Sequence, residues 1–263
     1  MSSDMTSMGA NASFPQARMA AGRFGAVFRH VGETGSTNTD LADEARSGET
    51  GTAVLVADHQ TAGRGRRDRV WSDSAGGQLL VSLRLSVGTA SPTEVGAAFA
   101  VAAQRTLESV GVNARIKWPN DLGMVRVDGT FAKLAGHLGE YVGGIAPVVI
   151  VGMGLNVSDA PVPGSTCVFD EVPHPEMAPD RDAVLTGVLD RLPVLLRSPE
   201  EVRSALRDRS ATIGTRVRVE RARGAVVGTA VGLDELGRLL LDDGREVHVI
   251  AAGDVIHLRS TDR

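Results

Sequence analysis

Arginines and glycines alternate in the stretch HQTAGRGRRDRVW, which spans residues 59–71 and ends in a tryptophan. Gly63 and Gly65 follow an apolar run, so the backbone can approach a ligand closely while the neighbouring guanidinium groups converge on anionic oxygens. Trp71 adds a flat ring that can pack against a purine base. Taken alone, the stretch is also compatible with a solvated loop, a nucleic-acid contact or a core tryptophan. The spacing favours a loop that binds an anionic ligand.

A second polar cluster, KWPND at residues 117–121, follows a predicted strand. A structural turn needs only its proline and its Asn-Asp pair. Lys117 adds a compact positive charge, and Asp121 is suited to hold magnesium or to orient a hydrogen-bond donor. Lys133 in KLAG is a further candidate cation, although a lone lysine in a strand is more often an edge residue. The stretch GMGLNV at 152–157 matches neither GxGxxG nor GxxxxGK[ST], so a Rossmann or P-loop nucleotide site is not supported.

Composition limits the class of protein. A chain of 263 residues that is 42% hydrophobic can bury a core in one large domain or two unequal ones. The net charge of -4 argues against a protein that coats nucleic acid. Cys167 is the only cysteine, which excludes an intrachain disulfide and fits a reducing, cytoplasmic location. The histidines form no metal-binding pattern, and no apolar run approaches the ~20 residues that span a bilayer.

The elements that must position these clusters mix strands and helices. A capping box over residues 91–94 predicts the start of an amphipathic helix that ends before Gly111. Two further helices are expected at 181–197, interrupted by Pro193, and at 199–209. Strands are predicted from apolar or alternating runs at TAVLVAD, LLVSLRL, ARIK, FAKLAGHLGEYV (a strand or hairpin) and APVVIVGM.

Three segments of different character divide the chain. Residues 1–24 lack periodicity and are expected to be a disordered tail, in which Met19 is an alternative start to Met1. Residues 25–209 are expected to form the main domain. Residues 210–263 contain five short strands separated by glycines and turn signals, which predict a small barrel.

Taken together and in this order, the motifs resemble those of the biotin protein ligases. The matching stretches are GSTN at 35–38, HQTAGRGRRDRVW, KWPND, KLAG, GMGLNV and the C-terminal strands. The resemblance implies an α+β fold like that of class II tRNA synthetases and lipoate ligases, with a mixed sheet flanked by helices and followed by an SH3-like barrel. It also implies the short, monofunctional form without an N-terminal helix-turn-helix, which would not bind DNA or a membrane.

The resemblance further implies two reaction steps. With Mg2+ present, the carboxylate of biotin attacks the α-phosphate of ATP. Pyrophosphate is released, and biotinyl-5'-AMP is formed. A lysine of a biotin carboxyl carrier domain, as in acetyl-CoA carboxylase, then attacks the activated carbonyl and expels AMP. The biotin carboxylate and ATP are both anions and repel each other. One cation about 4 Å away offsets about 4 kcal/mol of this repulsion at an effective dielectric near 20. The enzyme is expected to act as a monomer or homodimer.

Residue roles follow from the matching positions. Biotin and ATP binding is expected from Ser36, Thr37, Asn38, Gln60, Gly63, Arg64, Gly65, Arg66, Trp71, Asn120, Lys133, Gly136 and Asn156. Catalysis is expected from Lys133, Arg66, Lys117 and Asp121, with Asp121 also expected to hold magnesium. The polar side chains of GSTN suit the ureido ring of biotin, Lys133 suits the reacting oxygens, and Trp71 suits the adenine.

Two positions depart from the family pattern. Asp68 replaces the third glycine of the arginine stretch, and its carboxylate should weaken the hold of the arginines on an anion. We therefore expect Asp68→Gly to release biotinyl-5'-AMP more slowly than the wild type, and equal release rates would contradict this. His137 replaces an aliphatic residue after KLAG and is interpreted as a packing variation.

Three alternatives remain open at the level of sequence. A lipoate ligase would share the chemistry, but the sequence lacks that family's combined Arg-Arg, Gly-Gly-Gly signature. A nucleic-acid-binding regulator is opposed by the acidic balance of the chain. An inactive relative, disabled by Asp68, would bind biotin without turning over ATP.

Overall fold

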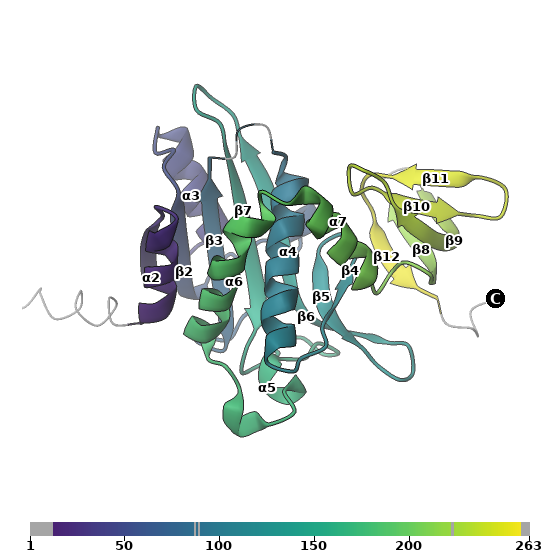
Figure 1. Cartoon of the computed structure of the whole chain (residues 1–263), viewed down its shortest axis with the longest axis horizontal. Coiled ribbons are helices and arrows are strands. Elements are labelled where there is room, and N and C mark those ends of the chain that lie inside the picture. The colour runs from purple at the N-terminus through teal and green to yellow at the C-terminus, as the bar shows by residue number, and fades with distance from the viewer. Residues whose placement is uncertain (1–12, 87, 89, 222–223, 259–263) are drawn as a thin grey trace, which may run out of the picture.

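The computed structural model describes residues 13–86, 88, 90–221 and 224–258, and its centre is a seven-stranded mixed sheet (Figure 1). The strand order is β1-β2-β3-β7-β6-β5-β4, with β1 and β2 parallel and every other neighbouring pair antiparallel. The strands are β1 (Val27–Thr34), β2 (Ala53–Gln60), β3 (Gln78–Leu85), β4 (Arg115–Lys117), β5 (Asp121–Val125), β6 (Phe131–Val142) and β7 (Val148–Asn156).

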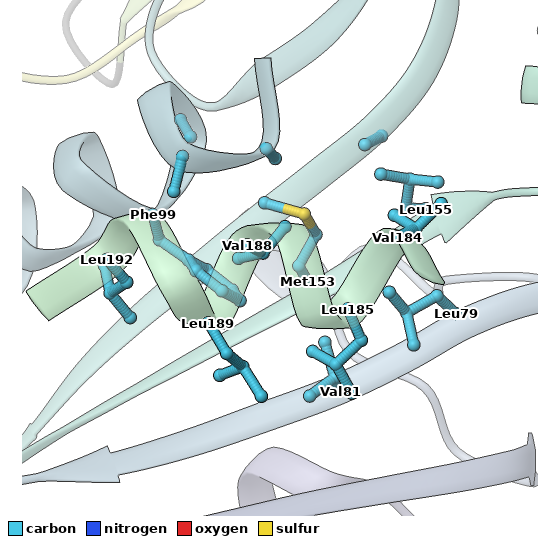
Figure 2. Close-up of a cluster of buried hydrophobic side chains, with 14 of the residues drawn as sticks. Leu79, Val81, Phe99, Met153, Leu155, Val184, Leu185, Val188, Leu189 and Leu192 are labelled. Atoms are coloured by element: carbon cyan, nitrogen blue, oxygen red, sulfur yellow. The ribbon is translucent and has the colours of Figure 1, made fainter. Parts of the chain in front are cut away.

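Helices cover both faces of this sheet. They are α2 (Pro15–Arg23), α3 (Thr37–Arg46), α4 (Pro92–Ser109), α5 (Val168–Glu171), α6 (Arg181–Leu195) and α7 (Pro199–Asp208), with 3-10 turns η1 (Arg66–Asp68) and η2 (Pro175–Met177). The helices α4 and α6 lie on one face, where Phe99 and Leu189 meet sheet residues such as Val81 and Met153 in the main core (Figure 2). Because both faces are covered, all eight residues of β3 are buried.

The predicted helix signals are confirmed, with one correction. Ser91 and Glu94 form the expected reciprocal capping box at the start of α4. The helix α6 is not interrupted at Pro193 but continues to Leu195. Pro193 lies in the last turn, where its missing N–H removes a single hydrogen bond, and Leu192 and Leu195 remain buried on either side of it.

On the opposite face, α3 covers only part of the sheet. Leu41, Ala42 and Ala45 of α3 pack against Leu55 and Ile150, and these residues form a separate small core. Beyond the N-terminal end of α3 this face carries polar residues and glycines instead. The short length of α3 therefore leaves room for a cavity on the sheet.

The prediction of a disordered tail over residues 1–24 is wrong for its second half, because residues 15–23 form α2. Phe14 is 4% exposed, and the side chain of Asp182 at the start of α6 accepts hydrogen bonds from the N–H groups of Gln16 and Ala17. A carboxylate at a helix N-terminus satisfies orphan donors and favours the helix dipole. Met19 lies within this helix, and residues 1–12 fall outside the described part of the chain.

We expect Phe14→Ala to lower the free energy of unfolding by about 3 kcal/mol, as large-to-small changes at buried aromatic positions do. Met19→Ala in the same helix is the matched control, because Met19 is 63% exposed. Urea unfolding of both variants would measure the difference. Equal stabilities would show that α2 is not docked as described.

The C-terminal strands form a second, five-stranded antiparallel sheet in the order β11-β10-β9-β8-β12. They are β8 (Arg216–Arg221), β9 (Gly224–Leu233), β10 (Leu239–Asp242), β11 (Val247–Ile250) and β12 (Asp254–His257). Trp118 of KWPND inserts into the apolar core of this sheet, and its Nε1 donates to the Gly237 carbonyl at 3.0 Å. The expected α+β architecture is confirmed. No helix of the described chain is long and apolar enough to cross a membrane.

Candidate active site

A hydrogen-bonded network lines the sheet at the N-terminal end of α3. The Gln60 Oε1 atom, at the end of β2, accepts from the Thr37 N–H at 2.8 Å and from the Thr37 hydroxyl at 3.1 Å. The Thr37 hydroxyl also lies 2.7 Å from that of Ser82 on β3. Ser36 is buried as the N-cap residue of α3, and its side chain makes no capping hydrogen bond. Ser36 therefore offers a hydroxyl to a ligand, while Thr37 is fixed by its neighbours.

Asn38 is held from both sides by residues that sequence reasoning missed. Its Oδ1 accepts from the Ser82 hydroxyl at 2.6 Å, and its Nδ2 donates to Glu140 Oε2 at 3.1 Å. The other carboxylate oxygen of Glu140 pairs with Arg64 at 2.8 Å. Ser82 lies between the apolar residues Val81 and Leu83 of β3, which is the one signal that the sequence offered. Asn38 and Arg64, which both line the first cavity described below, are thus joined through Glu140.

Two glycines of β7 explain how these side chains fit against the sheet. A Cβ atom on Gly152 would lie 2.0 Å from Asn38 Oδ1, and one on Gly154 would lie 2.2 Å from Cε2 of Trp71. Side chains two apart on a strand share a face, so GMG in β7 creates two adjacent flat places. Asn38 occupies one and the Trp71 ring occupies the other. Gly63 allows the same close approach, since its Cβ would lie 2.7 Å from the Trp71 carbonyl oxygen.

The arginine stretch forms a loop over this face, but its four arginines do not all converge on one point. Arg67 and Arg69 both bind the carboxylate of Asp254 on β12, and Arg67 also donates to the Glu220 carbonyl. Arg67 takes a left-handed backbone conformation with φ 55° to do so. The expectation of a single guanidinium cluster is therefore wrong for Arg67, which does not line the first cavity, whereas Arg69 lines that cavity while it pairs with Asp254. The C-terminal sheet holds this end of the loop.

The KWPND stretch turns through a cis Trp118–Pro119 peptide and brings Asp121 back toward β6. Asn120 binds β6 twice, because its Nδ2 donates to the His137 carbonyl at 2.9 Å and its own carbonyl accepts from the His137 N–H at 3.0 Å. Asp121 Oδ1 lies 2.7 Å from Lys133 Nζ. A Cβ on Gly136 would lie 2.9 Å from that ammonium, so the glycine leaves space for it.

These elements enclose a first cavity of about 200 Å³. It is lined by almost all of the predicted residues, including Ser36, Thr37, Asn38, Gln60, Arg64, Gly65, Arg66, Trp71, Lys117, Asn120, Asp121, Lys133 and Gly136. Asp254 and Val255 of the C-terminal sheet also line it. Residues from five separate motifs and both sheets therefore surround one space.

Arg66 and Lys117 carry the strongest electrostatic evidence for an anionic ligand. Burial lowers the pKa of both side chains, although Asp121 partly opposes this effect. Neither residue has an ion pair within the described part of the chain; Arg66 donates to Asn120 at 3.4 Å, and Lys117 lies over the Phe131 ring at 5.1 Å. Partly buried cations that form no ion pair carry a desolvation cost, and an incoming anion relieves that cost.

A second cavity of about 240 Å³ lies on the other side of Trp71 and Lys133. It is more apolar in character and is lined by Trp71, Phe131, Lys133, Asn156 and the segment 162–165. Asn156 is 3% exposed, and its Nδ2 donates to the Thr166 carbonyl at 2.9 Å. The Lys133 ammonium lies 5.4 Å from the centre of the Trp71 ring, where the two cavities meet. Among the described residues that were predicted to bind biotin or ATP, Asn156 lines the second cavity and not the first.

The ring of His137 packs against α4, where a Cβ on Gly96 would lie 2.9 Å from it, and His137 is also one of the residues that line the first cavity. Its Nδ1 is buried and has no hydrogen-bond partner in the described structure. Burial lowers the pKa of His137 to about 4, with the cations Arg66 and Lys133 contributing. The packing role proposed from sequence agrees with this position.

This histidine predicts a loss of stability in acid. Between pH 6.5, the ordinary value for histidine, and pH 4, the unfolded chain binds a proton at His137 that the folded chain excludes, so the free energy of unfolding falls as the pH falls. The loss amounts to about 3 kcal/mol by pH 4. Urea unfolding at pH 7 and pH 4.5 should show a smaller difference for His137→Leu than for the wild type. Equal differences would contradict the assignment.

Among the described residues that line the first cavity, the acidic ones are Asp121 and Asp254, and Asp254 pairs with Arg67 and Arg69. Across the described residues, no three histidine, cysteine or acidic side chains form a group that could hold a metal. Magnesium bound with ATP needs only one or two protein carboxylates in addition to phosphate oxygens. Asp121 therefore fits a nucleotide-borne magnesium and does not support a resident metal site.

Comparisons with known proteins agree with this arrangement. The Biotin/lipoate A/B protein ligase family matches residues 31–156, and the Biotin protein ligase C terminal domain matches residues 212–258. A biotin--[acetyl-CoA-carboxylase] ligase of Mycobacterium tuberculosis is 38% identical over 87% of this chain and 88% of its own length. Another from Paracoccus denitrificans is 32% identical over 86% of this chain and 98% of its own length.

Solved structures give the same result. The biotin protein ligase of Aquifex aeolicus in complex with biotin and ATP superimposes with a TM-score of 0.73 and 26% identity, covering 89% of this chain and 99% of that chain. Sequence and structural similarity therefore extend over both the large sheet and the C-terminal strands. The chain belongs to the biotin protein ligase family.

Proposed function

We propose that this protein activates biotin with ATP to form biotinyl-5'-AMP and transfers the biotinyl group to a lysine of a biotin carboxyl carrier domain. The observation that carries the proposal is the meeting of the two cavities at Lys133 and Trp71. A polar cavity edged by hydroxyl and amide groups suits the ureido ring and carboxylate of biotin. A more apolar cavity walled by Trp71 and Phe131 suits the adenine of ATP.

The first step needs two anions held in contact. Ser36 and Gln60 would hold the ureido ring, so the carboxylate of biotin extends toward Lys133. Arg66 and Lys117, the partly buried cations that form no ion pair among the described residues, would bind the phosphates. Lys133 would bridge the attacking carboxylate oxygen and the α-phosphate and would stabilise the charge that develops there. Pyrophosphate then leaves with the electrons of the broken P–O bond.

Magnesium supplies charge neutralisation on the phosphates when it is bound with ATP, and Asp121 is the residue that would orient it. In the second step the carrier lysine attacks the activated carbonyl carbon, and AMP leaves. The acceptor in this proposal is the carrier domain of acetyl-CoA carboxylase or a related carboxylase. We propose that the enzyme acts in the cytoplasm, as a monomer or homodimer, and does not bind DNA.

Biotin-dependent exchange of labelled pyrophosphate into ATP tests the first step without an acceptor. We expect exchange with biotin and none with lipoate. Exchange with lipoate would favour the lipoate ligase alternative. Binding of biotin without exchange would identify an inactive relative, and a direct biotin titration beside the exchange assay separates these outcomes.

A further inference from the structure

Asp73 is a buried carboxylate just beyond the arginine loop, and it lines neither cavity. Its side chain is 2% exposed, and its Oδ2 lies 2.8 Å from Nδ1 of His59. The same oxygen accepts from the N–H of Gln60 at 3.3 Å. Within the described structure His59 is the one cationic partner of this carboxylate. A carboxylate removed from water needs such a counter-charge, so the pair is a specific feature of this site.

The pair fastens the two ends of the loop to each other. The chain leaves β2 at Gln60, forms the loop, and returns through Trp71 to Asp73. Between these points the Trp71 N–H donates to the Gly63 carbonyl at 2.9 Å, which brings the same two segments together. Gln60 in turn holds the N–H and hydroxyl of Thr37 through Oε1. Asp73 is therefore connected to the first cavity through Gln60.

We propose that Asp73 and His59 are a positioning pair for biotin: the protonated imidazole holds the carboxylate in place, and the carboxylate holds Gln60 and the end of the arginine loop in the binding arrangement. The inference rests on the proposed function of the same cavity. It gives His59, the first residue of the stretch that predicted the site, a role that the chemistry of the cavity does not require.

The charges around His59 determine the direction of the pH effect. The hydrogen bond and charge of Asp73 raise the pKa of His59, and Glu33, its register partner on β1, raises it further. The charged pair is therefore complete below pH 6.5, the ordinary value, and is lost as the pH rises through the raised pKa. Above that point a charge-assisted hydrogen bond becomes a neutral one, and Asp73 remains buried without a counter-charge. Biotin affinity should therefore fall as the pH rises.

Direct titration of the full-length protein with biotin, without ATP, between pH 6 and pH 9 tests the inference. The wild type should lose about fivefold to tenfold in affinity over this range, which corresponds to one charge-assisted hydrogen bond. Asp73→Asn should be weaker by about tenfold at pH 6.5 and nearly independent of pH. His59→Gln retains a donor for Asp73 but does not titrate, so it should keep moderate affinity with a flat pH profile.

The matched control is His248→Gln, because His248 Nε2 pairs with Asp243 at 2.7 Å on the C-terminal sheet, away from both cavities. This variant should keep the wild-type pH profile. Steady-state kinetics add a second measurement: Asp73→Asn should raise the KM for biotin while kcat and the KM for ATP change less than about twofold. A merely structural role for Asp73 would instead lower the apparent kcat in proportion to the folded fraction and leave both KM values unchanged.

A wild-type pH profile in His59→Gln would overturn the inference, even if Asp73→Asn failed to fold. Equal losses of affinity for biotin and ATP in Asp73→Asn would also overturn it. A wild-type protein that binds biotin but performs no pyrophosphate exchange would contradict the proposed catalysis. The pH profiles of biotin affinity in wild type and His59→Gln would then still test the role of Asp73 and His59. A wild-type protein that does not bind biotin would defeat both.

Discussion

Replacement of Lys133 by alanine is expected to lower the rate of biotin-dependent pyrophosphate exchange by about 10³-fold. The ammonium lies 2.7 Å from Asp121 and 5.4 Å from the centre of the Trp71 ring, where the two cavities meet. At this point it can contact the carboxylate oxygen of biotin and the α-phosphate at once. One unit charge about 4 Å from the reacting oxygens contributes about 4 kcal/mol at an effective dielectric near 20, which corresponds to a factor of about 10³.

Arginine is not expected to replace this lysine. The sequence contains 26 arginines but lysines only at positions 117 and 133, and both line the first cavity. Lys133 Nζ occupies the space that Gly136 leaves open, where even a methyl group would approach within 2.9 Å. A planar guanidinium is larger and directs its hydrogen bonds in a fixed fork, so it cannot take that space. We expect Lys133→Arg to lose about 10²-fold despite its retained charge.

Arg46→Ala is the control for nonspecific loss of positive charge, because Arg46 is exposed on α3 and pairs with Asp43 one turn away. It should leave exchange unchanged. Biotin titration of Lys133→Ala should show that the cavity still binds biotin, since the ureido contacts are separate from the ammonium. An exchange rate above about a tenth of wild type in Lys133→Ala would contradict a catalytic role for this residue.

Short-range chemistry made much of the site predictable from sequence. The capping box of α4, the strands and the polar motifs each depend on residues within a few positions of one another, and the structure places these motifs around one cavity. Glycines at 152 and 154 carried a readable signal, because a strand that alternates glycine with apolar residues leaves one of its faces open. In the proposed function, the cations at 66, 117 and 133 would supply the chemistry of carboxylate activation, and their residue types were visible in the sequence.

Long-range contacts explain what the sequence could not reveal. The position of Arg67 and Arg69 depends on Asp254, which is 187 residues from Arg67, and α2 depends on an Asp182 carboxylate 165 residues from Ala17. No local pattern in the arginine stretch distinguishes Arg66, which lines the first cavity, from Arg67, which binds the C-terminal sheet and does not line that cavity. Trp118 is the same kind of case, because its ring completes the core of the C-terminal sheet. Its hydrogen-bond partner Gly237 is 119 residues away in the sequence.

Gly154→Ala is expected to disrupt both cavities with a single methyl group. A Cβ at this position would lie 2.2 Å from Cε2 and 2.5 Å from Cζ2 of the Trp71 ring, so the ring must move. The ring is a shared wall of the two cavities, and its Nε1 is buried without a partner among the described residues. We expect kcat/KM for ATP to fall by about 10²-fold and the free energy of unfolding to fall by about 1–3 kcal/mol, the usual range for overpacking.

Gly232→Ala on β9 is the matched control, since it adds the same methyl group to a strand where the nearest atom lies 3.9 Å away. Tryptophan fluorescence should separate the displacement of Trp71 from general unfolding, because the chain has two tryptophans and Trp118 is held in the C-terminal core. A shift of emission in Gly154→Ala with an unchanged circular dichroism spectrum would show that the ring has moved within a folded protein. Wild-type ATP kinetics in that variant would mean that the position of the Trp71 ring does not determine nucleotide binding, and the second cavity would lose its assignment to adenine.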